Sequence, residues 1–134
     1  MRALLPVLLL LAGFAGCQPP PKQNYFVFFE KWSAELDGQS RALIRAAVAY
    51  AKAHPDDRIA VIGYADPTGS KEANVDISAT RADRVRDALV ADGIASARIT
   101  TQGRGEVQPT WTEQEARRVE IRVGLENPVS TLRL

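Results

Sequence analysis

Two side chains of opposite charge, Asp66 and Arg81, stand where a polar ligand could be bound. Asp66 comes shortly after a continuous apolar run, residues 59–62, which is typical of a strand buried on both faces. Arg81 lies in the first turn of the helix predicted to follow. Ligands of α/β proteins favour the carboxyl ends of strands and the N-termini of the following helices. We therefore expect a carboxylate that accepts hydrogen bonds and a guanidinium that donates them to face one crevice.

Both residues also have ordinary structural interpretations. Residues 66–69 read Asp-Pro-Thr-Gly, which matches a type I turn with Pro second and Gly fourth. An aspartate in such a turn stabilises the loop locally, and an exposed arginine on a helix is usually solvated. The spacing alone leaves the binding and structural interpretations open.

The composition excludes several classes of chemistry. The 134 residues, 46% of them hydrophobic, suit one domain with one core. The 17 Lys and Arg against 16 Asp and Glu give a net charge of +1, so no basic excess favours nucleic-acid binding. Cys17 and His54 are the only residues of their types, which rules out an intrachain disulfide and a Cys/His zinc site. We expect no metal, no cofactor and no catalytic residue.

Residues 1–16 are predicted to be a signal peptide. Met1-Arg2 precedes an apolar run that is too short for a membrane span of ~20 residues. Residues 14–17 read Phe-Ala-Gly-Cys and resemble the lipobox of bacterial lipoproteins, in which the cysteine receives a diacylglycerol group and the chain is cut before it. This resemblance implies that Cys17 is lipidated. Gln18 is not an aspartate, so the resemblance to bacterial lipoproteins favours the outer membrane over the inner one.

A short tether is predicted between the lipid and the domain. Residues 17–24 contain three consecutive prolines and favour a polyproline II segment, which at ~3.1 Å per residue reaches about 20 Å. The globular domain is expected to cover residues 25–124, and residues 125–134 to form a tail outside it.

Hydrophobic periodicity predicts the elements of the domain. The expected order is strand 25–29, helix 39–53, strand 59–62, helix 76–92, strand 98–102 and strand 118–123. Strand-helix-strand units imply parallel pairs, and the strict alternation of residues 118–123 gives the last strand one solvated face. The predicted fold is an α+β two-layer sandwich of βαβαββ order, with a mixed parallel and antiparallel sheet and helices on one face.

Several side chains receive structural interpretations from this pattern. Ser78 is the expected N-cap of the second helix. Trp32 and Trp111 are expected in the core, with a place at the rim of a binding site as the alternative. Arg118 and Arg122 are expected on the solvated face of the last strand, with Glu120 between them.

Four motifs, in order along the chain, resemble those of one family. Residues 63–70 read Gly-Tyr-Ala-Asp-Pro-Thr-Gly-Ser, similar to the family's Gly-His-Thr-Asp-x-x-Gly-Ser. Residues 74–82, 103–106 and 117–121 are similar to Asn-x-x-Leu-Ser-x-x-Arg-Ala, Gly-x-Gly-Glu and Arg-Arg-Val-Glu. The family is the OmpA-like peptidoglycan-binding domain, seen also in the peptidoglycan-associated lipoprotein, and the resemblance runs from about residue 25 to 123.

The resemblance implies noncovalent binding of the diaminopimelate residue of peptidoglycan stem peptides. Asp66 and Arg81 match the family's binding aspartate and arginine, which would hold the ligand's ammonium and carboxylate. Free N–H groups at the start of the second helix are expected to add to the carboxylate site. Asn74 and Arg117 are further candidates, although Asn74 could instead fix the loop and Arg117 could instead lie on a solvated strand face. Tyr64 and Ala65 replace the family's His and Thr, which leaves the strength of binding open.

Three functions compete at this point. The leading interpretation is a lipid-anchored module in the periplasm that ties the outer membrane to peptidoglycan. The second is an OmpA-like scaffold that lacks strong wall binding and contacts another envelope protein. The third is a periplasmic hydrolase, which is disfavoured because His54 is expected at the end of the strand opposite Asp66.

Overall fold

The computed structural model describes residues 23–108 and 112–124. The predictions for the signal peptide, Cys17, most of the tether, Trp111 and the tail lie outside these residues. The elements are β1 (Gln23–Phe28), α1 (Gly38–Ala53), β2 (Ile59–Ala65), α2 (Lys71–Ala91), a 3-10 turn η1 (Ser96–Arg98), β3 (Ile99–Glu106), α3 (Glu113–Ala116) and β4 (Arg118–Val123). The predicted βαβαββ order is confirmed, with η1 and the single-turn α3 added.

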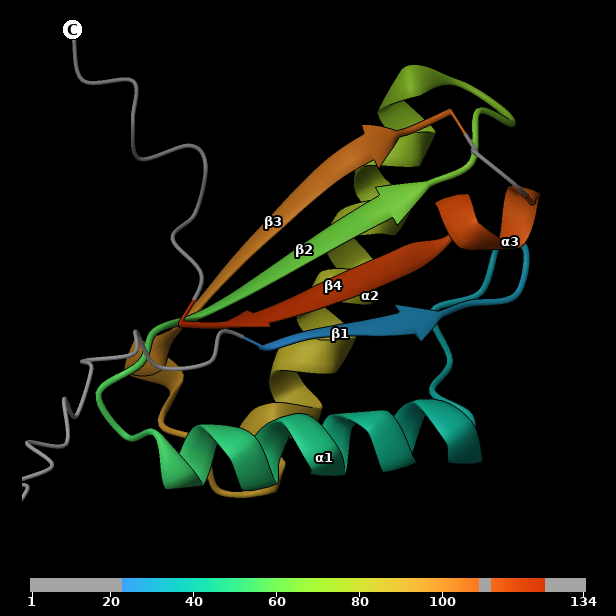
Figure 1. Cartoon of the computed structure of the whole chain (residues 1–134). Helices are drawn as coiled ribbons and strands as arrows, with labels where there is room; N and C mark the ends of the chain where they lie inside the picture. Colours follow the sequence, from blue (N-terminus) through green and yellow to red (C-terminus); the bar gives the residue numbers. More distant parts are fainter. Residues whose placement is uncertain (1–22, 109–111, 125–134) are drawn as a thin grey trace, which may run out of the picture.

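The four strands form one mixed sheet in the order β1-β4-β2-β3 (Figure 1). β4 is antiparallel to both β1 and β2, whereas β2 and β3 are parallel. The carboxyl ends of β1, β2 and β3 therefore lie at one edge of the sheet, together with the start of β4. The short helix α3 lies at this same edge (Figure 1).

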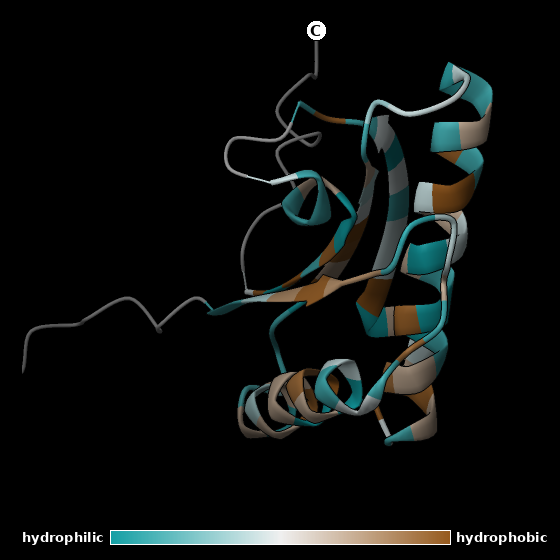
Figure 2. Cartoon of the chain, turned by 90° about the vertical axis from the view of Figure 1, so that its right-hand side faces the viewer, coloured by the Kyte–Doolittle hydropathy of each residue, from teal (hydrophilic) through white to brown (hydrophobic). Residues whose placement is uncertain are grey.

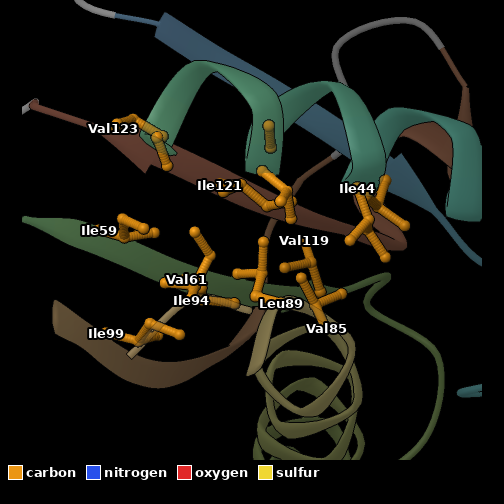
Figure 3. Packing of buried hydrophobic residues seen from close by; sticks show 14 of the residues in the cluster. Ile44, Ile59, Val61, Val85, Leu89, Ile94, Ile99, Val119, Ile121 and Val123 are labelled. Carbon is orange, nitrogen blue, oxygen red and sulfur yellow. The ribbon is translucent and has the colours of Figure 1, made fainter. Parts of the chain in front are cut away.

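The helices α1 and α2 pack on the same face of the sheet (Figure 2), as predicted. Asp37 caps α1 by accepting a hydrogen bond from the Ser40 amide at 2.7 Å. The core forms between both helices and the inward side chains of the strands (Figure 3). Its members include Ile44, Val61, Val85, Leu89, Val119 and Ile121.

Two glycines let α2 approach the sheet unusually closely. A Cβ atom on Gly63 of β2 would lie 1.9 Å from the Ser78 carbonyl oxygen, and one on Gly103 of β3 would lie 2.5 Å from the Ala79 nitrogen. Real Cβ atoms do not approach so closely, so only glycine fits at either position. The two glycines therefore set the depth of the α2 turn that precedes Arg81.

The second helix begins earlier than predicted, at Lys71 instead of residue 76. Its N-cap is Ser70, whose hydroxyl accepts a hydrogen bond from the Ala73 amide at 3.1 Å. The prediction that Ser78 is the N-cap was wrong. Ser78 lies inside the helix, fully buried, where its hydroxyl accepts from the Gly105 amide at 2.9 Å and ties α2 to β3.

The face of the sheet away from the helices carries a charged ladder on β4. Arg118 and Arg122 both donate to the Glu120 carboxylate, which is only 5% exposed. The prediction of a solvated face was therefore wrong for Glu120, because the two flanking guanidinium groups cover it. Arg118 also lies over the Tyr64 ring, 4.4 Å from its centroid.

Candidate functional site

A small cavity lies at the carboxyl end of β2, with a volume of about 10 Å³. Its lining residues come from the β1–α1 connection, the end of β2, α2 and the start of β4. They are Lys31, Trp32, Ala65, Asp66, Asn74, Ile77, Arg81 and Arg117. The structure therefore brings together all four residues that the sequence predicted for the domain's binding site. Their role in binding a ligand stays a prediction.

Asp66 follows the last residue of β2 and is 5% exposed. One carboxylate oxygen accepts from the Thr68 amide at 3.0 Å, which is the predicted turn contact. The other accepts from Arg117 at 3.0 Å. Burial by itself raises the pKa of Asp66, but the hydrogen bonds from Thr68 and Arg117 outweigh it and lower the pKa below its usual value. Asp66 is therefore a carboxylate at neutral pH.

Arg81 is the largest fully buried side chain among the described residues, at 1% exposure. Its guanidinium donates to three backbone carbonyls: Ser33 at 2.8 Å, Glu30 at 3.0 Å and Tyr64 at 3.4 Å. Burial lowers the pKa of Arg81 to about 10, with a further contribution from the positive charge of Arg117 and an opposing one from Asp66. The side chain remains a cation at neutral pH.

Arg117 connects the ends of β1 and β2 at the cavity. It stands just before β4, and its guanidinium donates to Asp66 and, through Nε, to the Phe29 carbonyl at 3.1 Å. The solvated alternative for this residue was wrong, since only 11% of its side chain is exposed. The sequence identified Arg117 only as a further candidate, because no local sequence pattern indicates that the start of β4 lies beside the end of β2.

The lining has an excess of positive charge. Three of the lining residues are cationic, Lys31, Arg81 and Arg117, and one is a carboxylate, Asp66. In a site of low dielectric such an excess favours an anionic ligand group over a cationic one. The arrangement can bind a carboxylate and still offer Asp66 to a neighbouring ammonium.

Asn74 is 1% exposed, and its amide nitrogen donates to Glu106 at 3.3 Å. This contact ties α2 to the end of β3 and supports the loop-fixing alternative, although Asn74 also lines the cavity.

The expectation that Arg81 lies in the first turn of α2 was wrong, because the helix begins at Lys71. The free N–H groups of the helix start are therefore almost three turns away from Arg81.

Trp32 corrects another expectation. It was predicted in the core, yet 54% of it is exposed and it lies at the cavity instead.

The two residues that depart from the family's loop motif, Tyr64 and Ala65, lie on opposite faces of the sheet. Ala65 lines the cavity, whereas Tyr64 packs with Ala60 and Ile62 on the face away from the helices.

The described residues contain no second site of obvious chemistry. His54 follows α1, before β2 begins, where its ring stacks on Tyr50 at 4.0 Å. It thus lies at the end of β2 opposite Asp66, as predicted. Within residues 23–108 and 112–124, no cluster of three or more His, Cys, Asp or Glu side chains could hold a metal. Among the helices described, none has the length and apolar character to cross a membrane.

The Asp66–Arg117 pair predicts a specific loss of stability in acid. Because the pKa of Asp66 is lowered in the folded protein, its contribution is complete above the usual value of 3.8 and is lost as the pH falls through the lowered value. Asp66→Asn should therefore melt below the parent at pH 7, and the gap in melting temperature should close as the pH falls from 3.8 through the lowered pKa of Asp66. Thermal denaturation across this range checks it, with exposed Asp76→Asn as the control. A gap that persists unchanged in acid contradicts the electrostatic account.

Comparison with known proteins places this architecture in one family. Residues 28–122 match the model of the OmpA family. The chain therefore belongs to the OmpA family, and the resemblance inferred from the four motifs is confirmed.

Individual relatives agree with this assignment. The chain is 36% identical over 101 residues to the probable lipoprotein YiaD of Escherichia coli (strain K12), which covers 71% of this chain and 46% of that protein. It is 50% identical over 58 residues to the peptidoglycan-binding protein ArfA of Mycobacterium tuberculosis, covering 43% of this chain and 18% of ArfA. The chain thus spans less than half the length of either relative.

A solved structure shows the same fold. The peptidoglycan-associated lipoprotein from Burkholderia pseudomallei superposes with a TM-score of 0.66 at 27% identity, over 74% of this chain and 88% of that one. The predicted α+β sandwich is therefore an OmpA-like domain.

Proposed function

We propose that this chain is an outer-membrane lipoprotein whose OmpA-like domain binds peptidoglycan noncovalently and ties the membrane to the wall. The ligand group is the free end of diaminopimelate, which carries an ammonium and a carboxylate on one carbon. The observation that carries the proposal is the convergence of Asp66, Arg81 and Arg117 on one cavity. One relative named as peptidoglycan-binding and one solved structure named as a peptidoglycan-associated lipoprotein support it.

The charges of the cavity suggest how the ligand is held. The ligand carboxylate lies near Arg81, whose guanidinium has five N–H groups and can keep carbonyl contacts while donating to a new acceptor. The ligand ammonium donates to Asp66 in partial exchange for Arg117. Arg117 then balances the second negative charge. No bond is made or broken, so the domain needs no catalytic group.

The experiment that tests this function is a pull-down on purified, diaminopimelate-containing peptidoglycan. The full-length chain in mild detergent should sediment with the wall fragments, and free meso-diaminopimelate should release it. Asp66→Asn should sediment far less, whereas the exposed Asp76→Asn control should behave as the parent. Sedimentation that neither the competitor nor Asp66→Asn reduces would reject the diaminopimelate site.

The lipid anchor has a separate test. Cys17 follows an apolar run and two small residues, and no other cysteine is present. We expect mass spectrometry of the native protein to find a mature N-terminus at Cys17 with acyl chains attached. Cys17→Ser should leave the chain unprocessed and without acyl groups. A native mature chain that has an unmodified Cys17 thiol contradicts the anchor.

One observation favours the scaffold alternative as a second candidate. The cavity holds about 10 Å³, and its charged groups already satisfy one another and the backbone. A domain that had lost wall binding would also keep such a closed cluster. The pull-down separates the two functions, because the scaffold does not sediment with the wall in a competitor-sensitive way.

A further inference from the structure

Trp32 has two features that cost free energy without contributing to the core. Its backbone has φ 56°, in the left-handed region that non-glycine residues rarely adopt. Its indole is also the most exposed large apolar side chain among the described residues, at 54%. A side chain held in this way at the edge of a binding cavity calls for a functional explanation.

The same arginines that line the cavity hold the Trp32 turn in place. Arg81 donates to the carbonyls of Glu30 and Ser33, on either side of Trp32. Arg117 donates to the Phe29 carbonyl just before them. On the other side, the indole lies over Gly69, where a Cβ atom would be 2.8 Å from its Cη2. The position of Trp32 is therefore coupled to the binding groups.

The cavity is too small for its ligand as it stands. A volume of about 10 Å³ admits roughly one water molecule. Asp66, Asn74 and Arg81 are buried and hydrogen-bonded, so they are the least free to move. Trp32 is exposed, and it also borders an open depression of about 590 Å³ that gives its ring room to turn. Trp32 is therefore the wall best able to move when a ligand enters.

The chemistry of the lining indicates what Trp32 would contact. The charged side chains of the lining would contact the charged end of the ligand. Trp32 and Ile77 form apolar parts of the cavity wall. In diaminopimelate three methylene groups connect this end to the stem-peptide backbone, and they must cross the mouth of the cavity to reach solvent. Apolar surface that leaves water against an indole contributes to binding.

We propose that Trp32 contacts the ligand: its indole moves off Gly69 and packs against the aliphatic segment of diaminopimelate. This inference rests on the proposed function, in which Asp66 and Arg81 hold the charged end of that residue. It assigns Trp32 a part of the affinity that does not depend on the terminal carboxylate. A stem peptide with lysine in place of diaminopimelate has a similar aliphatic segment and makes the same contact.

The test uses the indole itself as the reporter. Trp32 and Trp111 are the two tryptophans of the chain, so Trp111→Phe leaves Trp32 as the sole source of tryptophan fluorescence. Free meso-diaminopimelate, added to this full-length variant in mild detergent, should shift the emission, and half of the change should be reached at the Kd that calorimetry measures for the same ligand. Trp32→Gly should bind the diaminopimelate and lysine stem peptides each about tenfold more weakly, with their ratio unchanged. Glycine adopts a φ of 56° readily, so this variant should fold.

The outcomes separate this inference from the function on which it rests. If the parent binds diaminopimelate and Asp66→Asn does not, an unchanged Trp32 emission overturns the inference and leaves the function intact. The emission could also change only with a peptidoglycan fragment that carries the disaccharide, and not with free diaminopimelate. This result also overturns the inference, since Trp32 then contacts the sugar. No binding by the parent overturns both. If Trp32→Gly does not fold, the emission experiment decides alone.

Discussion

Gly63→Ala should destabilise the domain by about 3 kcal/mol or more, which is an appreciable part of the total stability of a small domain. The added methyl group would lie 1.9 Å from the Ser78 carbonyl oxygen and 2.7 Å from its carbon. Both atoms belong to the backbone of α2, so no side-chain rotation can relieve the clash. The helix must move away from the sheet, which opens the core and displaces Arg81.

Thermal denaturation measures this effect directly. At 4–8 °C per kcal/mol for a domain of roughly this size, Gly63→Ala should melt at least about 12 °C below the parent. Gly38→Ala is the matched control, because a Cβ there has no atom within 4 Å. Gly38 begins α1, and alanine has the higher helix propensity, so this control should melt at or slightly above the parent. Equal melting temperatures for the Gly63 variant and the parent would show that α2 does not pack as described.

The second large effect is expected at Arg81, where a substitution should reduce both the stability of the domain and ligand binding. Arg81→Ala removes the donor to three carbonyls and leaves a void against Phe29, whose ring lies 5.3 Å from the guanidinium carbon. The Glu30 carbonyl keeps its hydrogen bond from the Ser33 amide. A buried carbonyl that loses its partner costs about 1–3 kcal/mol, and the void adds to this cost, so we expect a loss of several kcal/mol and no detectable ligand binding.

Arg81→Lys separates the binding role from the structural one. Lysine keeps the positive charge, but its compact ammonium cannot reproduce the fork that reaches Ser33, Glu30 and a ligand carboxylate together. This variant should fold and bind diaminopimelate about ten- to a hundredfold more weakly, the value of one charge-assisted hydrogen bond of roughly 1.5–3 kcal/mol. The exposed Arg45→Lys on α1 should match the parent. Full binding by Arg81→Lys would contradict the proposed role.

The sequence predicted which side chains lie together better than it predicted the start of the helix that carries Arg81. Asp66 and Arg81 could be brought together because ligands favour the carboxyl ends of strands, whatever the boundary of the next helix. The boundary itself was misplaced, since residues 71–75 have little apolar periodicity and the helix start depends on the Ser70 cap. An error of one turn or more at a helix start therefore left the site intact.

Long-range neighbours were harder to predict. The Asp66–Arg117 pair depends on β4 lying beside β2, and several strand orders satisfy the same βαβαββ sequence. The exposed, left-handed Trp32 had no local signal, because glycine or asparagine usually marks such a backbone. The depth of α2 had no clear signal either, because the predicted strands end just before Gly63 and Gly103, whereas in the structure both glycines lie inside β2 and β3.

The central claim is that Asp66 and Arg81 together bind the charged end of diaminopimelate. Calorimetric titration of the full-length chain in mild detergent with two stem peptides tests it most directly, one with diaminopimelate at the third position and one with lysine. Lysine keeps the terminal amine for Asp66 but has no carboxylate for Arg81. We predict that the diaminopimelate peptide binds about ten- to a hundredfold more tightly, and that Arg81→Lys reduces this difference. Equal affinity of the parent for both peptides would contradict the claim.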